Sequence, residues 1–137
     1  MLIEMSGDEQ RLSEPVLNVL VVDDDELMQH TLSVYLSSLG HSDVIASNGQ
    51  QALDCLRDEH FDVILLDINM PVMNGSEVLA AIRKQEQQTG IHQIIIMVTG
   101  YAETDDLRKL TEAGADGYVV KPVDPIKLEF ELIRLTR

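Results

Sequence analysis

The fold of this chain is decided by the stretch Phe61-Asp-Val-Ile-Leu-Leu-Asp-Ile-Asn-Met-Pro-Val-Met-Asn-Gly75. Residues 63–66 form a short apolar run with the length and β-branched character of a strand buried on both faces. The run ends at Asp67, and Pro71 and the Asn74-Gly75 pair then interrupt regular structure. Open α/β sheets bind ligands at the carboxyl ends of their strands, so Asp67 is a candidate ligand-binding residue. Asp is also common as a plain loop residue, and this stretch alone leaves both interpretations open.

The composition indicates one folded domain with an acidic surface. The chain has 137 residues, of which 45% are hydrophobic, enough for one core and too few for two ordinary domains. The formal net charge is −14, from 24 acidic and 10 basic residues. A surface that binds nucleic acid needs clustered Lys and Arg, so this charge argues against a direct nucleic-acid ligand and favours a divalent cation.

No feature of the sequence indicates an oxidised or membrane-bound protein. Cys55 is the single cysteine, so there is no disulfide framework and no metal-ligand cysteine spacing. No apolar run approaches the ~18 residues of a membrane span. Residues 1–6 lack the basic region and the long apolar core of a signal peptide. We therefore expect a cytoplasmic protein that makes no membrane contact.

Hydrophobic periodicity predicts five strands that alternate with five helices. The predicted strands are residues 17–22, 44–46, 63–66, 93–99 and 118–120. The predicted helices are residues 26–39, a helix opened by a capping box at Ser47–Gln50, residues 76–88, residues 103–113, and residues 125–137 with Asp124 as the N-cap. Residues 84–88, at the far end of the third helix, are expected only to face solvent.

This alternation predicts an α/β fold with a doubly wound, five-stranded parallel sheet. Right-handed crossovers favour the flavodoxin-like strand order 2-1-3-4-5, with five helices on the two faces. Residues 17–137 are expected to form this domain. Residues 1–16 are expected to be a flexible N-terminal leader, with a short amphipathic turn as the alternative.

Polar residues follow four of the predicted strands at their carboxyl ends. Asp23 and Asp24 follow the first strand, Asp67 the third, Thr99 ends the fourth and Lys121 follows the fifth. In the order 2-1-3-4-5 these strands are neighbours, so their ends should converge. Carboxylates ~4 Å apart repel by about 4 kcal/mol per pair at an effective dielectric constant near 20, so a bound cation is expected to offset the repulsion. Mg²⁺ suits this oxygen-rich set, and a remaining carboxylate can act as a nucleophile toward phosphorus.

The motifs at these strand ends resemble those of response-regulator receiver domains of two-component and phosphorelay signalling. The resemblance is to the stand-alone chemotaxis type, and it covers roughly residues 17–137. Four motifs carry it, in family order and spacing: Val21-Val22-Asp23-Asp24, Asp67 to Gly75, Met97-Val98-Thr99-Gly100 and Tyr118-Val119-Val120-Lys121-Pro122. One residue departs slightly from the family pattern: Asn74 stands where Asp is commoner before Gly75, and both residues suit a left-handed turn.

The resemblance implies a role for each residue of the site. Asp67 would be the phosphoacceptor, and Asp23 and Asp24 would coordinate Mg²⁺ with it, Mn²⁺ being an alternative ion. The backbone carbonyl of Asn69 would be a further metal ligand, and Thr99 and Lys121 would bind the phosphoryl group. Gly100 would leave room for the phosphoryl group to enter. The peptide bond before Pro122 would be cis, and Tyr118 would be the aromatic switch residue. Tyr118 could instead be an ordinary half-buried aromatic, and Asp25 is expected only to cap the first helix.

The implied function is a signalling switch rather than an enzyme. A histidine kinase or a histidine phosphotransfer protein would phosphorylate Asp67, and phosphorylation would change the surface of the fourth helix, the fifth strand and the fifth helix. The chain would catalyse only its own phosphorylation and dephosphorylation. Two alternatives stay open here. One is an Mg²⁺-dependent phosphatase with an aspartyl intermediate, which would need an acid where Asn69 stands. The other is a pseudo-receiver that acts only as an interaction module.

The last helix carries two apolar stripes nearly opposite each other. Leu128, Leu132 and Leu135 suit a core, whereas a second stripe consists of Ile126, Phe130 and Ile133. We expect the second stripe to contact a downstream protein, a second copy of the chain as a homodimer, or a remainder of a longer protein. Scattered surface apolar residues are the alternative.

Overall fold

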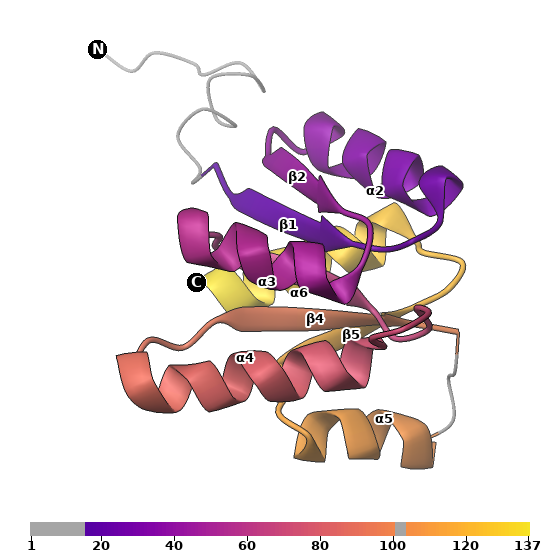
Figure 1. Cartoon of the computed structure of the whole chain (residues 1–137). Helices are drawn as coiled ribbons and strands as arrows, with labels where there is room; N and C mark the ends of the chain where they lie inside the picture. Colours follow the sequence, from indigo (N-terminus) through magenta and orange to yellow (C-terminus); the bar gives the residue numbers. More distant parts are fainter. Residues whose placement is uncertain (1–15, 101–103) are drawn as a thin grey trace.

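The computed structural model describes residues 16–100 and 104–137, which form a five-stranded parallel sheet flanked by helices (Figure 1). The strands are β1 (Asn18–Val22), β2 (Ser42–Ala46), β3 (Val63–Asp67), β4 (Ile94–Thr99) and β5 (Gly117–Val120). Their order is β2-β1-β3-β4-β5, and every pairing is parallel, which confirms the predicted topology. All five strands therefore end at the same edge of the sheet. The predicted leader lies outside the described residues except for Val16.

The described residues contain five helices, which cover both faces of the sheet. They are α2 (Glu26–Ser38), α3 (Gly49–Asp58), α4 (Gly75–Thr89), α5 (Thr104–Glu112) and α6 (Pro125–Thr136). Helices α2 and α6 pack on one face, and α3, α4 and α5 pack on the other (Figure 1). None of these helices is long and apolar enough to span a membrane.

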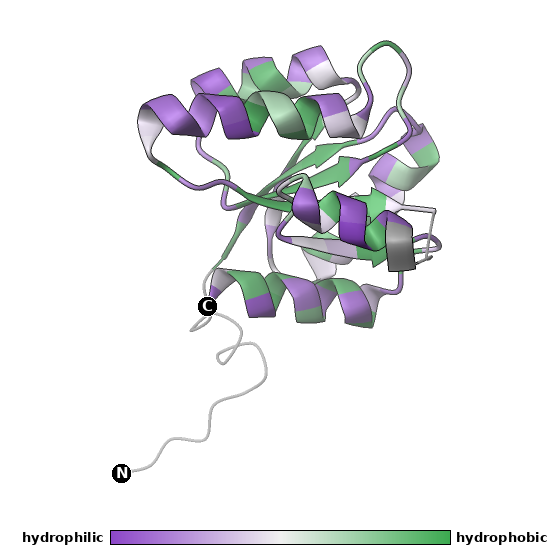
Figure 2. Cartoon of the chain, turned by 90° about the horizontal axis from the view of Figure 1, so that it is seen from below, coloured by the Kyte–Doolittle hydropathy of each residue, from purple (hydrophilic) through white to green (hydrophobic). Residues whose placement is uncertain are grey.

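Alternate side chains of each strand enter two separate hydrophobic cores. In β1, Val19 and Val21 belong to the core under α2 and α6, whereas Leu20 and Val22 belong to the core under the other three helices. Strand β3 is buried at every position. Figure 2 shows the same pattern as hydrophobic strands between helices that carry both hydrophobic and hydrophilic residues. The apolar run of residues 63–66 is therefore the centre of the sheet.

The helix caps confirm two predictions and correct one. Asp25 and Asp124 are the N-caps of α2 and α6, and each side chain accepts a hydrogen bond from the backbone N–H two residues on. The predicted capping box at Ser47–Gln50 does not form, because the helix begins one residue later. The N-cap of α3 is Asn48, whose side chain accepts a hydrogen bond from the backbone N–H of Gln51.

The prediction that Asn74 adopts a left-handed turn is wrong. Asn74 is extended (φ −76°, ψ 169°) and forms a complete capping box with Glu77 at the start of α4. The residue with positive φ in this loop is the exposed Val72 (φ 69°). Gly75 is needed for close approach rather than for a turn, because a Cβ atom there would collide with the backbone oxygen of Asp67.

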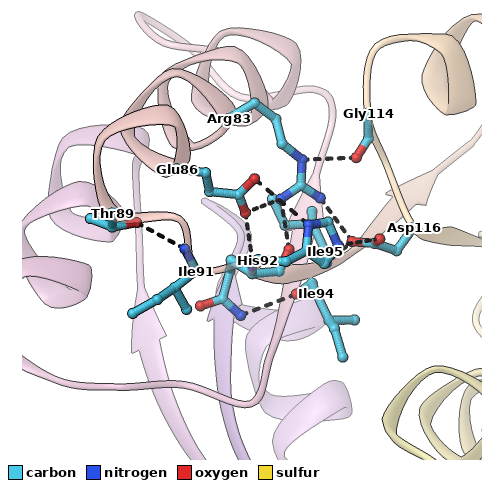
Figure 3. A network of polar contacts seen from close by, with 10 residues as sticks. Arg83, Glu86, Thr89, Ile91, His92, Ile94, Ile95, Gly114 and Asp116 are labelled. Carbon is cyan, nitrogen blue, oxygen red and sulfur yellow. Dashed lines mark hydrogen bonds and ion pairs between the residues drawn. The ribbon is translucent and has the colours of Figure 1, made fainter.

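A polar network joins α4 to the amino ends of β4 and β5 (Figure 3). The half-buried Arg83 side chain donates from Nε to the carbonyl oxygen of Gly114 at 2.9 Å and from Nη1 to that of Gln93 at 2.7 Å. It also forms ion pairs with Asp116, at 2.8 Å from Nη2, and with Glu86. One guanidinium group therefore ties the last turns of α4 to the loops that precede β4 and β5.

Both carboxylates of this network have further partners. Asp116 accepts a hydrogen bond from the backbone N–H of Ile95 at 2.8 Å and contacts the His92 ring at 2.7 Å. Glu86 accepts from the backbone N–H of Gln93 at 2.6 Å. The expectation that residues 84–88 only face solvent is therefore wrong for Glu86, whose side chain is 18% exposed.

Helix α6 presents its two stripes as the sequence pattern suggests. Leu128 and Leu132 are buried in the core beside α2. Ile126 and Phe130 are 77% and 64% exposed, and Ile133 is less exposed, at 38%.

Candidate functional site

Three carboxylates meet at the carboxyl edge of the sheet. Asp23 and Asp24 directly follow β1, and Asp67 is the last residue of the neighbouring strand β3. One carboxylate oxygen of each residue lies within 4.8 Å of those of the other two. Asp23 and Asp67 are buried, at 1% and 2% exposure, whereas Asp24 is exposed. The convergence expected from the strand order is therefore present.

One oxygen of Asp23 has no hydrogen-bond partner within residues 16–100 and 104–137. Its Oδ1 accepts a hydrogen bond from the backbone N–H of Asp25 at 2.9 Å, but its buried Oδ2 has no hydrogen-bond partner among the described residues. Burial raises the pKa of Asp23 from 3.8 to about 6; the Asp25 N–H opposes this rise and the charge of Asp67 adds to it. A buried, unpaired carboxylate oxygen beside two further carboxylates is a donor set that fits a hard divalent cation such as Mg²⁺.

Lys121 connects this cluster to β5. Its Nζ lies 2.9 Å from Oδ1 of Asp67. Burial lowers the pKa of Lys121, but the hydrogen bond and the charge of Asp67 outweigh this effect and raise it overall. The backbone N–H of Asn69 also points to Asp67 Oδ1, at 3.4 Å. The peptide bond between Lys121 and Pro122 is cis.

Thr99 and Gly100 lie beside this group. Thr99 ends β4, is 1% exposed, and its backbone oxygen accepts a hydrogen bond from the Lys121 N–H at 2.7 Å. Gly100 is exposed, and a Cβ atom built there would meet no atom of the described residues within 4 Å. These residues therefore join the acidic cluster at one edge of the sheet.

Tyr118 lies apart from the acidic cluster. Its side chain is 40% exposed and lines a groove of about 430 Å³ between β5 and α6. The same groove is lined by Ile126 and Phe130 from the outer stripe of α6. In this structure Tyr118 therefore belongs to the outer surface rather than to the carboxylate pocket.

The sequence analysis missed a contact made by Gln29. Its Nε2 donates to the backbone oxygen of Asp23 at 2.7 Å and to Oγ of Ser47 at 3.2 Å. A glutamine within a helix is an ordinary residue, so nothing in the sequence pattern distinguishes it.

Comparison with known proteins identifies the family. The family model described as the response regulator receiver domain matches residues 19–132. The chain belongs to the response regulator receiver domain family. Receiver domains occur in longer proteins, and this chain spans less than half the length of the curated relatives it matches. One of them is hybrid signal transduction histidine kinase I of Dictyostelium discoideum, which is 38% identical over 136 residues, covering 96% of this chain and 8% of the kinase.

Solved receiver structures share the fold. The chemotaxis response regulator CheY4 of Vibrio cholerae has a TM-score of 0.80 and 34% identity, covering 88% of this chain and 99% of CheY4. The receiver domain of Saccharomyces cerevisiae Ssk1, solved with the histidine phosphotransfer protein Ypd1, has a TM-score of 0.84 and 29% identity over 89% of this chain and 90% of that one. The receiver domain of PA1611 from Pseudomonas aeruginosa, with magnesium in its active-site cleft, has a TM-score of 0.78 and 29% identity over 89% and 98% of the two chains.

The family assigns this receiver domain to a class of function. It is a phosphoacceptor signalling domain, and its acidic cluster is of the kind at which receiver domains bind Mg²⁺. The phosphatase and the pseudo-receiver alternatives find no support among these relatives.

Proposed function

We propose that Asp67 accepts a phosphoryl group and that the chain acts as a signalling switch through this modification. The observation that carries the proposal is the environment of the Asp67 carboxylate. It is buried, lies 2.9 Å from the Lys121 ammonium, and shares a 4.8 Å cluster with Asp23 and Asp24. A carboxylate beside a cation site and an ammonium is suited to attack phosphorus.

We assign the metal ligands to Asp23, Asp24, Asp67 and the backbone carbonyl of Asn69. The unpaired, buried Oδ2 of Asp23 supports this assignment, and the oxygen donors suit Mg²⁺ and also Mn²⁺. When bound, such an ion offsets carboxylate repulsion and negative charge on the phosphoryl oxygens.

The remaining residues would bind the phosphoryl group and transmit its presence. Lys121 would pair with the new negative charge, Thr99 would hydrogen-bond it, and Gly100 would leave room for its entry. Tyr118 would turn inward as Thr99 moves, changing the surface formed by α5, β5 and α6.

The phosphoryl donor would be a histidine kinase or a histidine phosphotransfer protein. The Ssk1 receiver domain in complex with such a phosphotransfer protein supports this kind of partner. We further propose that residues 17–137 act as the receiver domain in the cytoplasm, without nucleic-acid or membrane contact. Its catalysis would be limited to its own phosphorylation and dephosphorylation.

The outer stripe of α6 is a proposed partner surface for a downstream protein or a second copy of the chain. Ile126, Phe130 and Ile133 are exposed on it, and the first two line the groove beside Tyr118. Replacing Phe130 by Glu should abolish self-association or partner binding. Unchanged behaviour in both sedimentation and partner-binding assays would remove this surface from the proposal.

Incubation with acetyl phosphate and Mg²⁺ followed by intact-mass measurement tests the acceptor role of Asp67. The wild-type chain should gain the mass of one phosphoryl group, and the gain should vanish when Mg²⁺ is chelated. The Asp67→Asn variant should gain nothing. A phosphoryl adduct that survives in Asp67→Asn would overturn the assignment of the acceptor.

A further inference from the structure

We propose that Gln29 is a positioning residue that holds Asp23 and Asp24 in their metal-binding arrangement. The inference rests on the proposed function, because it takes the acidic cluster to be a cation site. It concerns a helix residue that does not itself belong to the three-carboxylate cluster.

The Gln29 side chain links three segments of the chain. Gln29 lies at the start of α2, and its Nε2 donates to the backbone oxygen of Asp23 at 2.7 Å. The same nitrogen lies 3.2 Å from Oγ of Ser47, which follows β2. Ser47 is itself held, because its backbone N–H donates to Oε1 of Gln51 at 2.7 Å. The turn that carries the acidic residues is therefore tied to both α2 and the loop after β2.

The bond to Asp23 fixes a peptide plane rather than a carboxylate. The carbonyl group of Asp23 is coplanar with the nitrogen and the Cα atom of Asp24. Holding the Asp23 oxygen in place therefore fixes the N–Cα bond of Asp24 and restricts the directions that the exposed Asp24 side chain can take.

The other bonds of Asp23 leave one oxygen for a ligand. Its backbone N–H donates to the oxygen of Ala46 at 3.1 Å, and its Oδ1 accepts from the N–H of Asp25. With the carbonyl oxygen held by Gln29, Oδ2 is the atom left unpaired among the described residues. Gln29 thus completes a set of hydrogen bonds around Asp23 that leaves Oδ2 as the oxygen available to a cation.

Charge repulsion explains why such a frame affects binding. In the metal-free state the three carboxylates repel one another, and the exposed Asp24 is the one free to turn away. A fixed peptide plane keeps the cluster converged, so less rearrangement accompanies the arrival of a cation. Residues that orient metal ligands in this way typically change metal affinity about 10- to 100-fold when they are removed.

Magnesium titration of the full chain by calorimetry tests the inference. Gln29→Ala, and Gln29→Met as a variant of similar length without the donor, should each weaken Mg²⁺ binding about tenfold. Ser33→Ala is the matched control, because Ser33 also lies on α2 and ties it to β2 through a 3.1 Å hydrogen bond to Asp43, away from the acidic cluster. Ser33→Ala should bind Mg²⁺ as tightly as the wild type does.

Two further measurements separate positioning from plain stabilisation. The urea midpoints of the metal-free Gln29 and Ser33 variants should fall by similar small amounts. The rate of phosphoryl-adduct formation by the Gln29 variants should return to the wild-type rate at saturating Mg²⁺. Unchanged Mg²⁺ affinity in both Gln29 variants, or equal weakening in Ser33→Ala, would overturn the inference. The proposed function would still stand in that case, because it fails only if the wild-type chain forms no adduct at Asp67.

Discussion

Each end of the sheet carries a cluster of carboxylates with one basic side chain. The two clusters differ in whether the buried polar atoms have hydrogen-bond partners among the described residues. At the amino ends, Glu86 and Asp116 share one guanidinium group, and both accept further bonds from backbone N–H groups (Figure 3). At the carboxyl ends, Asp23, Asp24 and Asp67 lie together, the Lys121 ammonium bonds to Asp67, and a buried oxygen of Asp23 stays unpaired among the described residues.

This difference separates a cluster that holds the fold from one that can hold a ligand. A saturated network has no free donor or acceptor to offer, and breaking it leaves buried charge uncompensated. In an incomplete acidic cluster the repulsion between carboxylates lowers the stability of the fold, and a cation that binds there raises the stability again. Substitutions at the two ends should therefore have opposite effects on stability.

The largest effect is expected at the saturated end. Replacing Arg83 by Met leaves Glu86 and Asp116 without their cation, so the free energy of unfolding should fall by about 3 kcal/mol. Urea denaturation measures this loss, and Lys84→Met, at the exposed neighbouring position, is the control. Mg²⁺ affinity of the folded variant should match that of the wild type; a large loss of affinity would mean that the two clusters are not independent.

The opposite sign is expected at the incomplete end. Asp23→Asn removes a buried charge whose pKa is raised to about 6, so the metal-free variant should be more stable than the wild type at neutral pH, by about 2 kcal/mol. The same variant should lose most of its Mg²⁺ affinity. A destabilised Asp23→Asn variant would show that this carboxylate serves the fold.

The pH dependence of stability tests the contribution of Asp23 in the acidic cluster. Between pH 3.8 and about 6 the folded chain keeps a proton on Asp23 that the unfolded chain has released. The contribution of Asp23 to the stability of the metal-free protein should therefore fall as pH rises through this window. The difference between urea midpoints of wild type and Asp23→Asn, measured in chelator across the window, isolates this contribution from that of other carboxylates. A difference that does not vary with pH would contradict it.

The smallest effect on the free energy of unfolding is expected at His92, at the exposed edge of the Arg83 network. The His92 side chain is 59% exposed and contacts an Asp116 carboxylate that Arg83 already neutralises. His92→Gln should therefore change the free energy of unfolding by about 0.5 kcal/mol or less in urea denaturation. A loss as large as that of Arg83→Met would mean that the imidazole, rather than the guanidinium, holds the network.

The incomplete cluster was predictable from the sequence, whereas the saturated one was not. Asp23, Asp67 and Lys121 each stand at the end of an apolar run, and the parallel topology brings such ends together whatever the loops do. Apart from Glu86 on the same helix, the partners of Arg83 come from loops up to 33 residues away, and no periodicity marks them. Glu86 accordingly looked like one more charge on a solvated helix end.

The conformation of Asn74 could not be predicted from the sequence either, because it depends on local geometry. Asn before Gly suits both a left-handed turn and a helix N-cap, and sequence alone does not separate them. The close approach of Gly75 to the Asp67 backbone decides the matter, since it requires α4 to begin directly after the loop. The hydrogen bond of Gln29 to Asp23 is of the same kind, because it depends on how α2 leaves the strand.

The most direct test of this contrast is a Mg²⁺ titration of the metal-free wild-type chain followed by amide chemical shifts. We expect saturable shifts at the carboxyl ends of the strands, around residues 23–25, 67–69 and 121, with none around residues 83–95 and 114–116. Saturable shifts at the Arg83 network, or their absence around Asp23 and Asp67, would contradict it.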